Sequence, residues 1–471
     1  MIAETVERVF QLQADSLNLQ RLKDTSSGQR LDKIRRVEKY ISDPVNRKAF
    51  TEALFADMRK SEEESLVNEL VPTLMTITYI KKHMHSWIRD ERVESPLSMS
   101  GMRSYIRYEP KGNVLIFAPW NYPFQLTIMP MLYAIAAGNA VIIKPSEFAP
   151  ATAAFMQKMV SSLFPENEVA VINGEVETAT ALLKKPFNHI YFTGSPGVGR
   201  IVMEAAAKHL TSVTLELGGK SPVIIDPSYG AVRAARKLVW AKTMNCGQTC
   251  IAPDYIFIHE SQLDDFVSGY KVALEKFYHS NGNGIKNSRL YSRMVNLKNF
   301  HRVKLLVDDA VAQGAEVLCG GDADESDLYI APTLIGKVNR SMKVMQEEIF
   351  GPVLPVVTYN DRSEVVKLIS ELPKPLALYI LSGNSGNTDF YMRNTTAGGT
   401  AINELMVTTV NQNLPFGGVN NSGIGKSNGK YSFHEFSNAR GVIKRIWGTI
   451  SLLYPPYQRW IINLLQKIAR Y

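Results

Sequence analysis

Cysteine is scarce in this chain: its 471 residues include three. Two lie in the stretch NCGQTC (245–250), and the third, Cys319, stands alone. Zinc clips need further cysteine or histidine ligands, and no such cluster accompanies this pair, so we expect no metal site. So few cysteines also favour a reducing compartment, and we expect a cytoplasmic protein. Two interpretations of NCGQTC stay open: small buried side chains, or one reactive thiol in a polar setting.

An export signal is also lacking. The N-terminus, MIAETVERVF, has neither the basic start nor the continuous apolar core of a secretory signal, and it predicts an amphipathic helix. We therefore expect no export. An uncharged run at 126–143, LTIMPMLYAIAAGNAVII, is long enough to suggest a membrane span. Pro130 and the Gly138-Asn139 pair favour instead a buried helix followed by a strand.

Acidic residues are absent from position 436 onward, a segment with six basic ones: Arg440, Lys444, Arg445, Arg459, Lys467 and Arg470. This tail supplies most of the formal net charge of +8. A basic protein could bind nucleic acid, but no basic motif interleaved with aromatics and no zinc knuckle is present, so we expect no such partner. With 45% hydrophobic and 21% charged residues, the composition is that of a soluble globular enzyme. The length suits two or three domains.

The first ninety residues have a helical period. Apolar residues recur there at spacings of three and four, which predicts one buried helical face: Leu31, Ile34, Val37, Ile41, Phe50, Leu54, Phe55 and Met58. From Ser104 the pattern changes to an alternation of Tyr105, Arg107 and Glu109, which predicts an exposed ribbon.

Apolar strands then alternate with helical stretches. The predicted strands are 114–118, 140–144, 168–172, 189–193, 214–217 and 221–226. Such alternation indicates a mostly parallel, doubly wound α/β sheet, which binds ligands at the carboxyl ends of its strands. A second α/β region follows Cys250, with predicted strands at 255–259, 316–320 and 354–359.

Two stretches could contact a nucleotide. In HIYFTGSPGVGR (189–200) a strand is followed by three glycines and a helix, whose first amides could bind a phosphate. The pattern lacks the standard dinucleotide spacing, and a plain tight turn explains it equally well. KPSE (144–147) also follows a strand; its Lys144 and Glu147 could hold ribose hydroxyls or form an ordinary solvated strand end.

Two polar residues stand in apolar surroundings. Glu216 lies inside the strand TLELGG (214–219), where a carboxylate is costly unless it is paired, protonated or used. It is either a satisfied core residue or a general base with a raised pKa. Asn121, in APWNYPF (118–124), is either a turn residue or an amide donor for an oxyanion.

Taken in order, these motifs resemble the aldehyde dehydrogenase superfamily from about residue 30 to about residue 440. The resemblance rests on APWNYPF, KPSE, FTGSPGVG (192–199), LELGGKSP (215–222), GQTC (247–250), EEIFGP (347–352) and PFGGVNNSG (415–423). The spelling WNYP, the sequence APDY (252–255) and the basic tail are similar to the class 3 and fatty aldehyde branch.

The resemblance implies a mechanism. Cys250 would be the nucleophile, Asn121 and the N–H of Cys250 would hold the oxyanion, and Glu216 would activate the hydrolytic water. The activity would be NAD(P)-dependent oxidation of a medium- or long-chain aliphatic or aromatic aldehyde to the acid. Two alternatives are transfer of the acyl group to coenzyme A and a non-catalytic protein on the same fold.

The resemblance also implies a cofactor site. Lys144 and Glu147 would hold the adenosine ribose, and Glu147 would favour NAD over NADP, although NADP is often accepted in this branch. The remaining contacts implied are Gly194, Ser195, Val198 and Gly199 at the pyrophosphate and adenine, Glu348 and Phe350 at the nicotinamide, Trp120 along the crevice, and Tyr122 at the substrate tunnel.

The implied architecture is an aldehyde dehydrogenase-like homodimer. A doubly wound cofactor domain would span 1–97 and 111–218, and a catalytic α/β domain 219–420. An oligomerisation arm would span 98–110 and 421–450, and a basic amphipathic tail 451–471. Two residues depart from the pattern. Cys246 replaces alanine and could approach Cys250 if the segment is helical, and Asn420 replaces a small residue near the substrate funnel.

The tail from Tyr457, YQRWIINLLQKIARY, has one apolar helical face and one basic face. The apolar face holds Tyr457, Trp460, Ile461, Leu464, Leu465, Ile468 and Tyr471, and Pro455 and Pro456 precede it as a helix start. About 15 residues are too few to span a bilayer. Packing on a subunit, covering the substrate entrance and lying on an anionic membrane all stay open.

Overall fold

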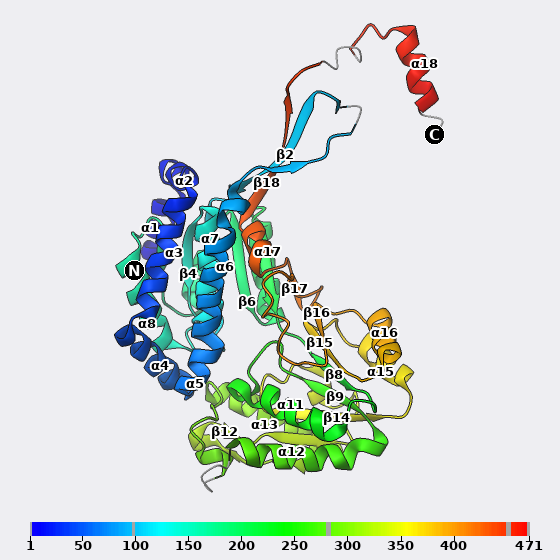
Figure 1. The fold of residues 1–471 in the computed structure, drawn as a ribbon. Helices are drawn as coiled ribbons and strands as arrows, with labels where there is room; N and C mark the ends of the chain where they lie inside the picture. Colours follow the sequence, from blue (N-terminus) through cyan, green and yellow to red (C-terminus); the bar gives the residue numbers. More distant parts are fainter. Residues whose placement is uncertain (1, 97–98, 279–283, 449–453, 469–471) are drawn as a thin grey trace.

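The computed structural model describes residues 2–96, 99–278, 284–448 and 454–468. Two sheets form the body, and a three-stranded ribbon projects from it (Figure 1). The six-stranded sheet has the order β17-β7-β6-β3-β4-β5. Its strands are β3 (Asn113–Phe117), β4 (Ala140–Lys144), β5 (Val169–Val171), β6 (His189–Gly194), β7 (Ser212–Leu217) and β17 (Gly423–Ile424).

The strand order locates a crevice in this sheet. From β3 the chain moves outward to β4 and β5, then returns to the other side of β3 for β6 and β7, and all of these pairings are parallel. The order therefore reverses between β3 and β6. Open α/β sheets bind ligands beyond the carboxyl ends of the strands at such a reversal. This confirms the doubly wound α/β fold predicted from the sequence.

Helices cover both faces of this sheet. One face packs against α1 (Ile2–Ala14), α9 (Val176–Leu183) and α10 (Pro196–Ala207). The other packs against α3 (Ser27–Ser42), α4 (Pro44–Met58), α6 (Val71–Ile88), α7 (Gln125–Ala137), α8 (Pro150–Leu163) and α17 (Gly429–Glu435). Two short helices complete the N-terminal layer, α2 (Ser16–Lys23) and α5 (Glu62–Ser65), and a π-helical turn, Leu66–Leu70, joins α5 to α6.

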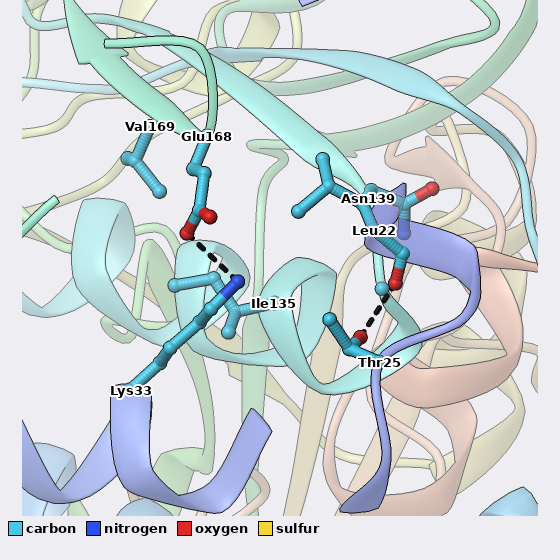
Figure 2. A pocket seen from close by; sticks show the side chains of 8 residues that line it. Leu22, Thr25, Lys33, Ile135, Asn139, Glu168 and Val169 are labelled. Atoms are coloured by element: carbon cyan, nitrogen blue, oxygen red, sulfur yellow. Dashed lines mark hydrogen bonds and ion pairs between the residues drawn. The ribbon is translucent and has the colours of Figure 1, made fainter. Parts of the chain in front are cut away.

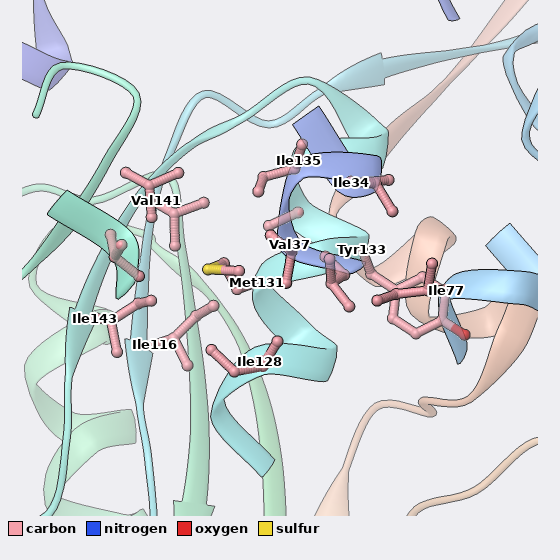
Figure 3. Close-up of a cluster of buried hydrophobic side chains, with 14 of the residues drawn as sticks. Ile34, Val37, Ile77, Ile116, Ile128, Met131, Tyr133, Ile135, Val141 and Ile143 are labelled. Carbon is pink, nitrogen blue, oxygen red and sulfur yellow. The ribbon is translucent and has the colours of Figure 1, made fainter. Parts of the chain in front are cut away.

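Helix α7 explains the long uncharged run. Figure 3 shows Ile128, Met131 and Ile135 of α7 between the strands and the outer helices. The helix ends at Gly138, which has φ 94°, and β4 follows directly. The prediction of a buried helix and strand at 126–143 is therefore confirmed. Among the described residues no helix is both long and apolar enough to cross a membrane.

The predicted buried helical face is wrong for one residue, Phe55. Phe50, Leu54 and Met58 of α4 are buried, but the side chain of Phe55 is 53% exposed. The buried residues recur every four positions, and Phe55 lies one position past Leu54, about 100° further round the helix. Large apolar residues on a solvent-facing side are common and need no further cause.

The seven-stranded sheet has the order β10-β13-β14-β9-β8-β15-β16. Its strands are β8 (Pro222–Ile225), β9 (Tyr255–His259), β10 (Glu316–Cys319), β13 (Thr333–Gly336), β14 (Val353–Tyr359), β15 (Ala377–Leu381) and β16 (Gly399–Ile402). The predicted strand at 221–226 thus belongs to this sheet rather than to the first one. The four residues between β7 and β8, Gly218 to Ser221, carry the chain across. A separate two-stranded sheet pairs β11 (Ala323–Asp324) with β12 (Tyr329–Ile330).

Helices also cover both faces of the second sheet. One face packs against α11 (Ala231–Thr243) and α12 (Leu263–Tyr278). The other packs against α13 (Leu297–Ala312), α14 (Lys343–Gln346), α15 (Arg362–Ser370) and α16 (Ser385–Asn394).

The projecting ribbon consists of β1 (Glu91–Val93), β2 (Met102–Pro110) and β18 (Ser437–Arg445), all antiparallel. Beyond it, α18 (Arg459–Ile468) stands apart from the body (Figure 1). The amphipathic tail helix predicted from the sequence is present. Residues 97–98 and 449–450 of the expected domains and arm, and residues 451–453 and 469–471 of the expected tail, lie outside the described residues.

Candidate active site

The segment before Cys250 is a strained turn after α11. Asn245, Cys246 and Gly247 have φ of 50°, 54° and 71°, a left-handed conformation that costs free energy in residues other than glycine. At Gly247 the conformation and the space both require glycine, because a Cβ would lie 2.3 Å from the carbonyl oxygen of Gly351. Strain of this kind persists only where the surrounding contacts fix the backbone, and it is common at functional sites.

Gln248 supplies one of those contacts. Its buried side chain donates to the carbonyl of Arg293 at 3.0 Å and accepts from the N–H of Val295 at 3.0 Å. The turn that leads to Cys250 is thereby fixed against the segment before α13.

Cys250 itself is partly buried. Burial and the neighbouring carboxyls of Glu348 and Glu216 together raise the pKa of its thiol to about 12, although the backbone N–H groups of Cys250 and Ile251 oppose the shift. At neutral pH the sulfur therefore rests as a thiol. Formation of a thiolate requires transfer of the proton to a base, and a nearby positive charge would stabilise the anion.

Asn121 follows β3 and is 3% exposed. Its Nδ2 donates to the carbonyl oxygen of Gln248 at 3.0 Å, which uses one of the two amide hydrogens and places the amide beside the turn that leads to Cys250. The main-chain oxygen of Asn121 accepts from Lys60 Nζ at 3.0 Å and from Asn245 Nδ2 at 2.8 Å. Both the backbone and the side chain of Asn121 are thus held in place.

Tyr122 comes next in the chain and is 6% exposed. Its hydroxyl forms a hydrogen bond with Thr249 Oγ1 at 2.8 Å, one residue before Cys250. Burial raises the pKa of the phenol well above its usual value, and the carboxyl of Glu64 adds to the shift. The tyrosine therefore stays neutral and is bonded to the residue before Cys250.

Glu216 is 7% exposed, and its Oε1 accepts from Ser427 Oγ at 2.6 Å. Its Oε2 has no hydrogen-bond partner among the described residues. Burial raises the pKa of this carboxyl to about 8, although the bond from Ser427 and the charge of Lys426 oppose the shift. A carboxyl with a raised pKa and a free oxygen is suited to accept a proton.

Glu348 and Phe350 follow α14 in the chain. Burial raises the pKa of Glu348 to about 8, and Asp254 adds to the shift. The Glu348 carboxylate fits directly against Gly218, because a Cβ there would lie 2.1 Å from Oε2. The ring of Phe350 packs edge-on against Trp120 with 5.3 Å between centroids.

A glycine-lined helix start lies beside Glu216. In the sheet Thr193 is aligned with Glu216 and Gly194 with Leu217. Ser195 then caps α10, a Cβ added at Gly197 would meet open space, and Val198 is 46% exposed. A Cβ at Gly199 would collide with the side chain of Leu217, so this glycine allows α10 to approach the sheet.

Lys144 and Glu147 lie at the same edge of the sheet. Lys144 ends β4, is 5% exposed, and binds Glu147 Oε2 at 2.5 Å. The carbonyl of Lys144 accepts from the N–H of Ala118 at 3.1 Å, which ties this pair to the segment that leads to Trp120 and Asn121. An anion-binding helix start with a lysine and a carboxylate next to it fits the phosphates and ribose of a dinucleotide.

All the predicted site residues therefore lie at the carboxyl edge of the six-stranded sheet or on the loops that face it. Cys250, Glu348 and Phe350 reach this edge from the region of the second sheet. Among the described residues no group of three or more His, Cys, Asp or Glu could hold a metal ion.

The structure shows the surroundings of the two residues that depart from the family pattern, Cys246 and Asn420. Cys246 is fully buried; its Sγ lies 3.5 Å from the hydroxyl of Tyr291, in the cluster on one face of the second sheet, whereas Cys250 contacts the cluster on the other face. All three cysteines are free. Asn420 is exposed, has φ 57° and accepts from Lys374 Nζ at 3.0 Å.

Sequence reasoning missed several site residues. Lys60, Glu64 and Glu69 belong to the charged N-terminal segment, and Ser427 follows the recognised PFGGVNNSG stretch without a motif of its own. The available signal was the S-x-x-E pattern of Ser61 and Glu64, which marks a helix start and carries no information about long-range contacts.

A small pocket lies away from the candidate active site. Figure 2 shows it between α3, α7 and the starts of β4 and β5, with Lys33 reaching Glu168. Asn139 and Val169, which line it, are at the amino ends of strands whose carboxyl ends face the site. The pocket is thus on the opposite edge of the sheet from Lys144.

Comparison with known proteins agrees with this geometry. A family model described as the aldehyde dehydrogenase family matches residues 3–442. A putative aldehyde dehydrogenase AldX of Bacillus subtilis is 43% identical over 94% of this chain and 98% of that protein. A 4,4'-diaponeurosporen-aldehyde dehydrogenase of Staphylococcus aureus is 40% identical over 96% and 97%. Aldehyde dehydrogenase family 3 member A2 of Pongo abelii is 43% identical over 86% and 82%.

Solved structures have the same fold. A substrate-bound Staphylococcus aureus AldH superposes with a TM-score of 0.92 at 38% identity, covering 98% of this chain and 99% of that one. A Mycobacterium tuberculosis aldehyde dehydrogenase complexed with NAD+ superposes with a TM-score of 0.84 at 25% identity, covering 95% and 92%.

Proposed function

The chain belongs to the aldehyde dehydrogenase family, in its class 3-like part, and from this premise we propose that it oxidises an aldehyde to a carboxylic acid through a covalent adduct on Cys250. The observation that carries the proposal is the meeting of three groups: a cysteine, an amide donor bonded to the turn before it, and a buried carboxyl with a pKa of about 8.

The first step forms a carbon–sulfur bond. Cys250 gives its proton to solvent water, and the resulting thiolate attacks the carbonyl carbon, so that the carbonyl π electrons move to oxygen. Asn121 Nδ2, whose second hydrogen is not used by Gln248, and the N–H of Cys250 donate to that oxyanion. A bound nicotinamide dinucleotide supplies the two-electron hydride acceptor. Loss of the hydride leaves a thioester on Cys250.

The second step breaks the same bond. Glu216 takes a proton from water, and the resulting hydroxide adds to the thioester carbon. Asn121 holds the second oxyanion in the same place, and its collapse releases the carboxylic acid and the Cys250 sulfur. The proton on Glu216 then returns to solvent.

For the dinucleotide we propose contacts at both ends. Lys144 and Glu147 hold the adenosine ribose, and the start of α10 with Gly194, Ser195, Val198 and Gly199 holds the pyrophosphate and adenine. Glu348, Phe350 and Trp120 position the nicotinamide. Because Glu147 would repel a 2′-phosphate, NAD is preferred and NADP is accepted less well.

The proposed substrate is an apolar aldehyde, medium- or long-chain aliphatic or aromatic. Tyr122, whose hydroxyl is bonded to Thr249 one residue before Cys250, supports this choice with an aromatic ring near the sulfur. Glu216 supports hydrolysis rather than transfer to coenzyme A, because its raised pKa and its Oε2 without a hydrogen-bond partner among the described residues suit a general base for water.

The test is a chain-length series of aldehydes assayed with NAD and NADP, on the parent protein and on Cys250→Ala and Glu216→Gln. We expect the parent to release acid without coenzyme A, Cys250→Ala to be inactive, and Glu216→Gln to form one equivalent of NADH and then stall. Equal oxidation by Cys250→Ala and the parent would exclude the mechanism. Absence of NADH across the whole panel with reduced protein would favour the non-catalytic alternative.

We also propose a homodimer that uses the ribbon of β1, β2 and β18. The ribbon projects from the body (Figure 1), and beyond its end Trp447 is 66% exposed. The proposed units are a cofactor domain (1–97 and 111–218), a catalytic domain (219–420), the arm (98–110 and 421–450) and the tail (451–471). Sedimentation of the parent and of a variant with β2 charges reversed tests the assembly.

The tail carries a second proposal, peripheral contact with an anionic membrane. Trp460 is 53% and Leu465 47% exposed on α18, which stands apart from the body in Figure 1, and the segment after 436 has basic residues and no acidic ones. Flotation with anionic liposomes should require residues 456–471. Equal flotation of full-length and truncated protein, or none of either, would exclude membrane contact.

A further inference from the structure

Two oppositely charged side chains are completely buried between the N-terminal helices and the active site. Lys60 and Glu69 are both 0% exposed, and Lys60 Nζ lies 2.7 Å from Glu69 Oε1. Helix α4 ends at Met58, and Arg59 adopts a left-handed φ of 51°, which turns the chain so that Lys60 faces inward. Glu69 lies in the π-helical turn Leu66–Leu70, and such turns are frequent at functional sites.

This pair binds the segment that contains Asn121. Lys60 Nζ donates to the carbonyl oxygen of Asn121 at 3.0 Å and lies 4.4 Å above the ring of Tyr122. Glu69 Oε2 accepts from the N–H groups of Phe124 at 2.9 Å and Gln125 at 3.2 Å. The cation therefore holds one end of residues 121–125 and the anion holds the other.

The same helical segment also binds the nucleophile turn. Glu64 Oε1 accepts from the N–H of Asn245 at 2.5 Å, and its Oε2 accepts from Ser292 Oγ at 2.7 Å. Asn245 Nδ2 in turn donates to the carbonyl oxygen of Asn121 at 2.8 Å. Lys60 and Asn245 thus share one acceptor, and the amide donor and the nucleophile are fixed to a common support.

We propose that Lys60 and Glu69 form a positioning pair that aims the Asn121 amide at the oxygen of the Cys250 adduct. The inference rests on the proposed aldehyde oxidation. Neither side chain contacts the reacting atoms; each acts through the backbone of residues 121–125. An oxyanion donor is effective only when it is already oriented, and a shift of about 1 Å can cost about 10²-fold in rate. A buried ion pair with four backbone and side-chain bonds provides that orientation.

A double-mutant cycle tests this role. In the parent, Lys60→Met should lower kcat by about 10- to 100-fold and leave the Kd for NAD unchanged. In an Asn121→Ala background, the same substitution should lower kcat by less than about twofold, because no amide is left to aim. Equal losses in both backgrounds would overturn the proposal and assign the pair to general folding stability. Rates are normalised to the folded fraction by titration of bound NAD.

A matched control and a milder variant complete the experiment. Lys33 forms a largely buried ion pair with Glu168 at 2.7 Å, shown in Figure 2, on the far edge of the sheet, with side-chain exposures of 14% and 10%. Lys33→Met should leave kcat unchanged. If Lys60→Met does not fold, Glu69→Gln retains the shape and one acceptor; it should lower kcat about 3- to 10-fold in the parent and not with Asn121→Ala. An equal loss in both backgrounds overturns the proposal here too.

The proposed function can fail separately from this inference. If Cys250→Ala or Asn121→Ala keeps full activity, the chemistry itself is wrong, and the pair has no oxyanion donor to position. If both variants are impaired but the effects of Lys60 and Asn121 multiply, the chemistry stands and the positioning role falls.

Discussion

Two loops of the candidate site, residues 121–125 and residues 344–349, are each held by a buried lysine paired with a carboxylate. Lys60 and Glu69 hold residues 121–125. Lys220, paired with Asp254, donates to the carbonyls of Val344 at 2.8 Å and Glu347 at 2.9 Å, and Asp254 Oδ1 accepts from the N–H of Ile349 at 2.9 Å. In both cases the lysine binds carbonyls and the carboxylate binds amides of the same loop.

The difference between the loops lies in what they present. The first presents the neutral amide of Asn121, whose state does not change with pH. The second presents Glu348, whose carboxyl has a pKa raised to about 8 by burial and by Asp254. The comparison teaches that a common way of holding a loop can serve the two purposes proposed above: fixing a neutral donor for the reaction, and placing a titratable group against the cofactor.

The largest expected effect is on the first loop. Asn121→Ala removes the amide donor while the backbone contacts of Lys60 and Asn245 remain. Loss of one preorganised oxyanion donor should lower kcat by about 10²- to 10³-fold. Steady-state kinetics with saturating NAD measures this effect, and the Kd for NAD should stay at the parent value. A change confined to the Kd for NAD would mean that this loop, too, serves the cofactor.

A change in the second loop should affect the KM for NAD more than kcat. Lys220→Met frees the carbonyls of Val344 and Glu347 and leaves Asp254 unpaired, so Glu348 is no longer held at Gly218. We expect the KM for NAD to rise about tenfold, with a smaller change in kcat. Fluorescence titration with NAD and steady-state kinetics separate the two. If Lys220→Met and Lys60→Met alter the same parameter equally, the two loops do not divide their roles.

Much of the site could be predicted from the sequence, because its parts follow apolar strands. Asn121 follows β3, Lys144 ends β4, Gly194 ends β6 and Glu216 lies in β7, so strand prediction alone brings them to one edge. Cys250 could be placed with them through the family resemblance, since the sequence contains no local signal that joins the second sheet to the first.

The support behind the site could not be predicted. Lys60 and Glu69 are nine positions apart in a charged stretch, a pattern typical of a solvated helix face. The left-handed turn at Arg59 and the π-helical turn at 66–70 interrupt the helical period, so no regular spacing places both side chains inward. The same limit explains Phe55, whose apolar character does not reveal that it lies one position off the buried face.

A pH profile of the reaction separates the contribution of Glu216, which titrates, from that of Asn121, which does not. Glu216 must be ionised to accept a proton, and burial raises its pKa to about 8, so the protonated, inactive form dominates below that pH. Hydrolysis of the acyl-enzyme should therefore increase with pH, from about one tenth of its maximum at pH 7 to a plateau above pH 9. Single-turnover acid release measures this rate. Asn121→Ala should lower the whole profile without moving its midpoint, and a shifted midpoint would contradict a purely neutral role.

The smallest expected effect lies outside both loops, at the adenosine end. Lys144 is buried and its partner Glu147 has a side chain that is 29% exposed, so the carboxylate of this pair is open to the proposed ligand. Glu147→Gln removes the charge that would repel a ribose 2′-phosphate, so kcat/KM for NADP should rise about 3- to 10-fold relative to NAD. The exposed pair of Lys304 and Asp308 offers a control, and Asp308→Asn should leave the ratio unchanged.

Because Glu147 contacts neither loop, kcat with saturating NAD should stay within about twofold of the parent. A large loss of kcat would show that the adenosine end also orients the reacting groups, and the control of the chemistry could then not be assigned to the two loops alone.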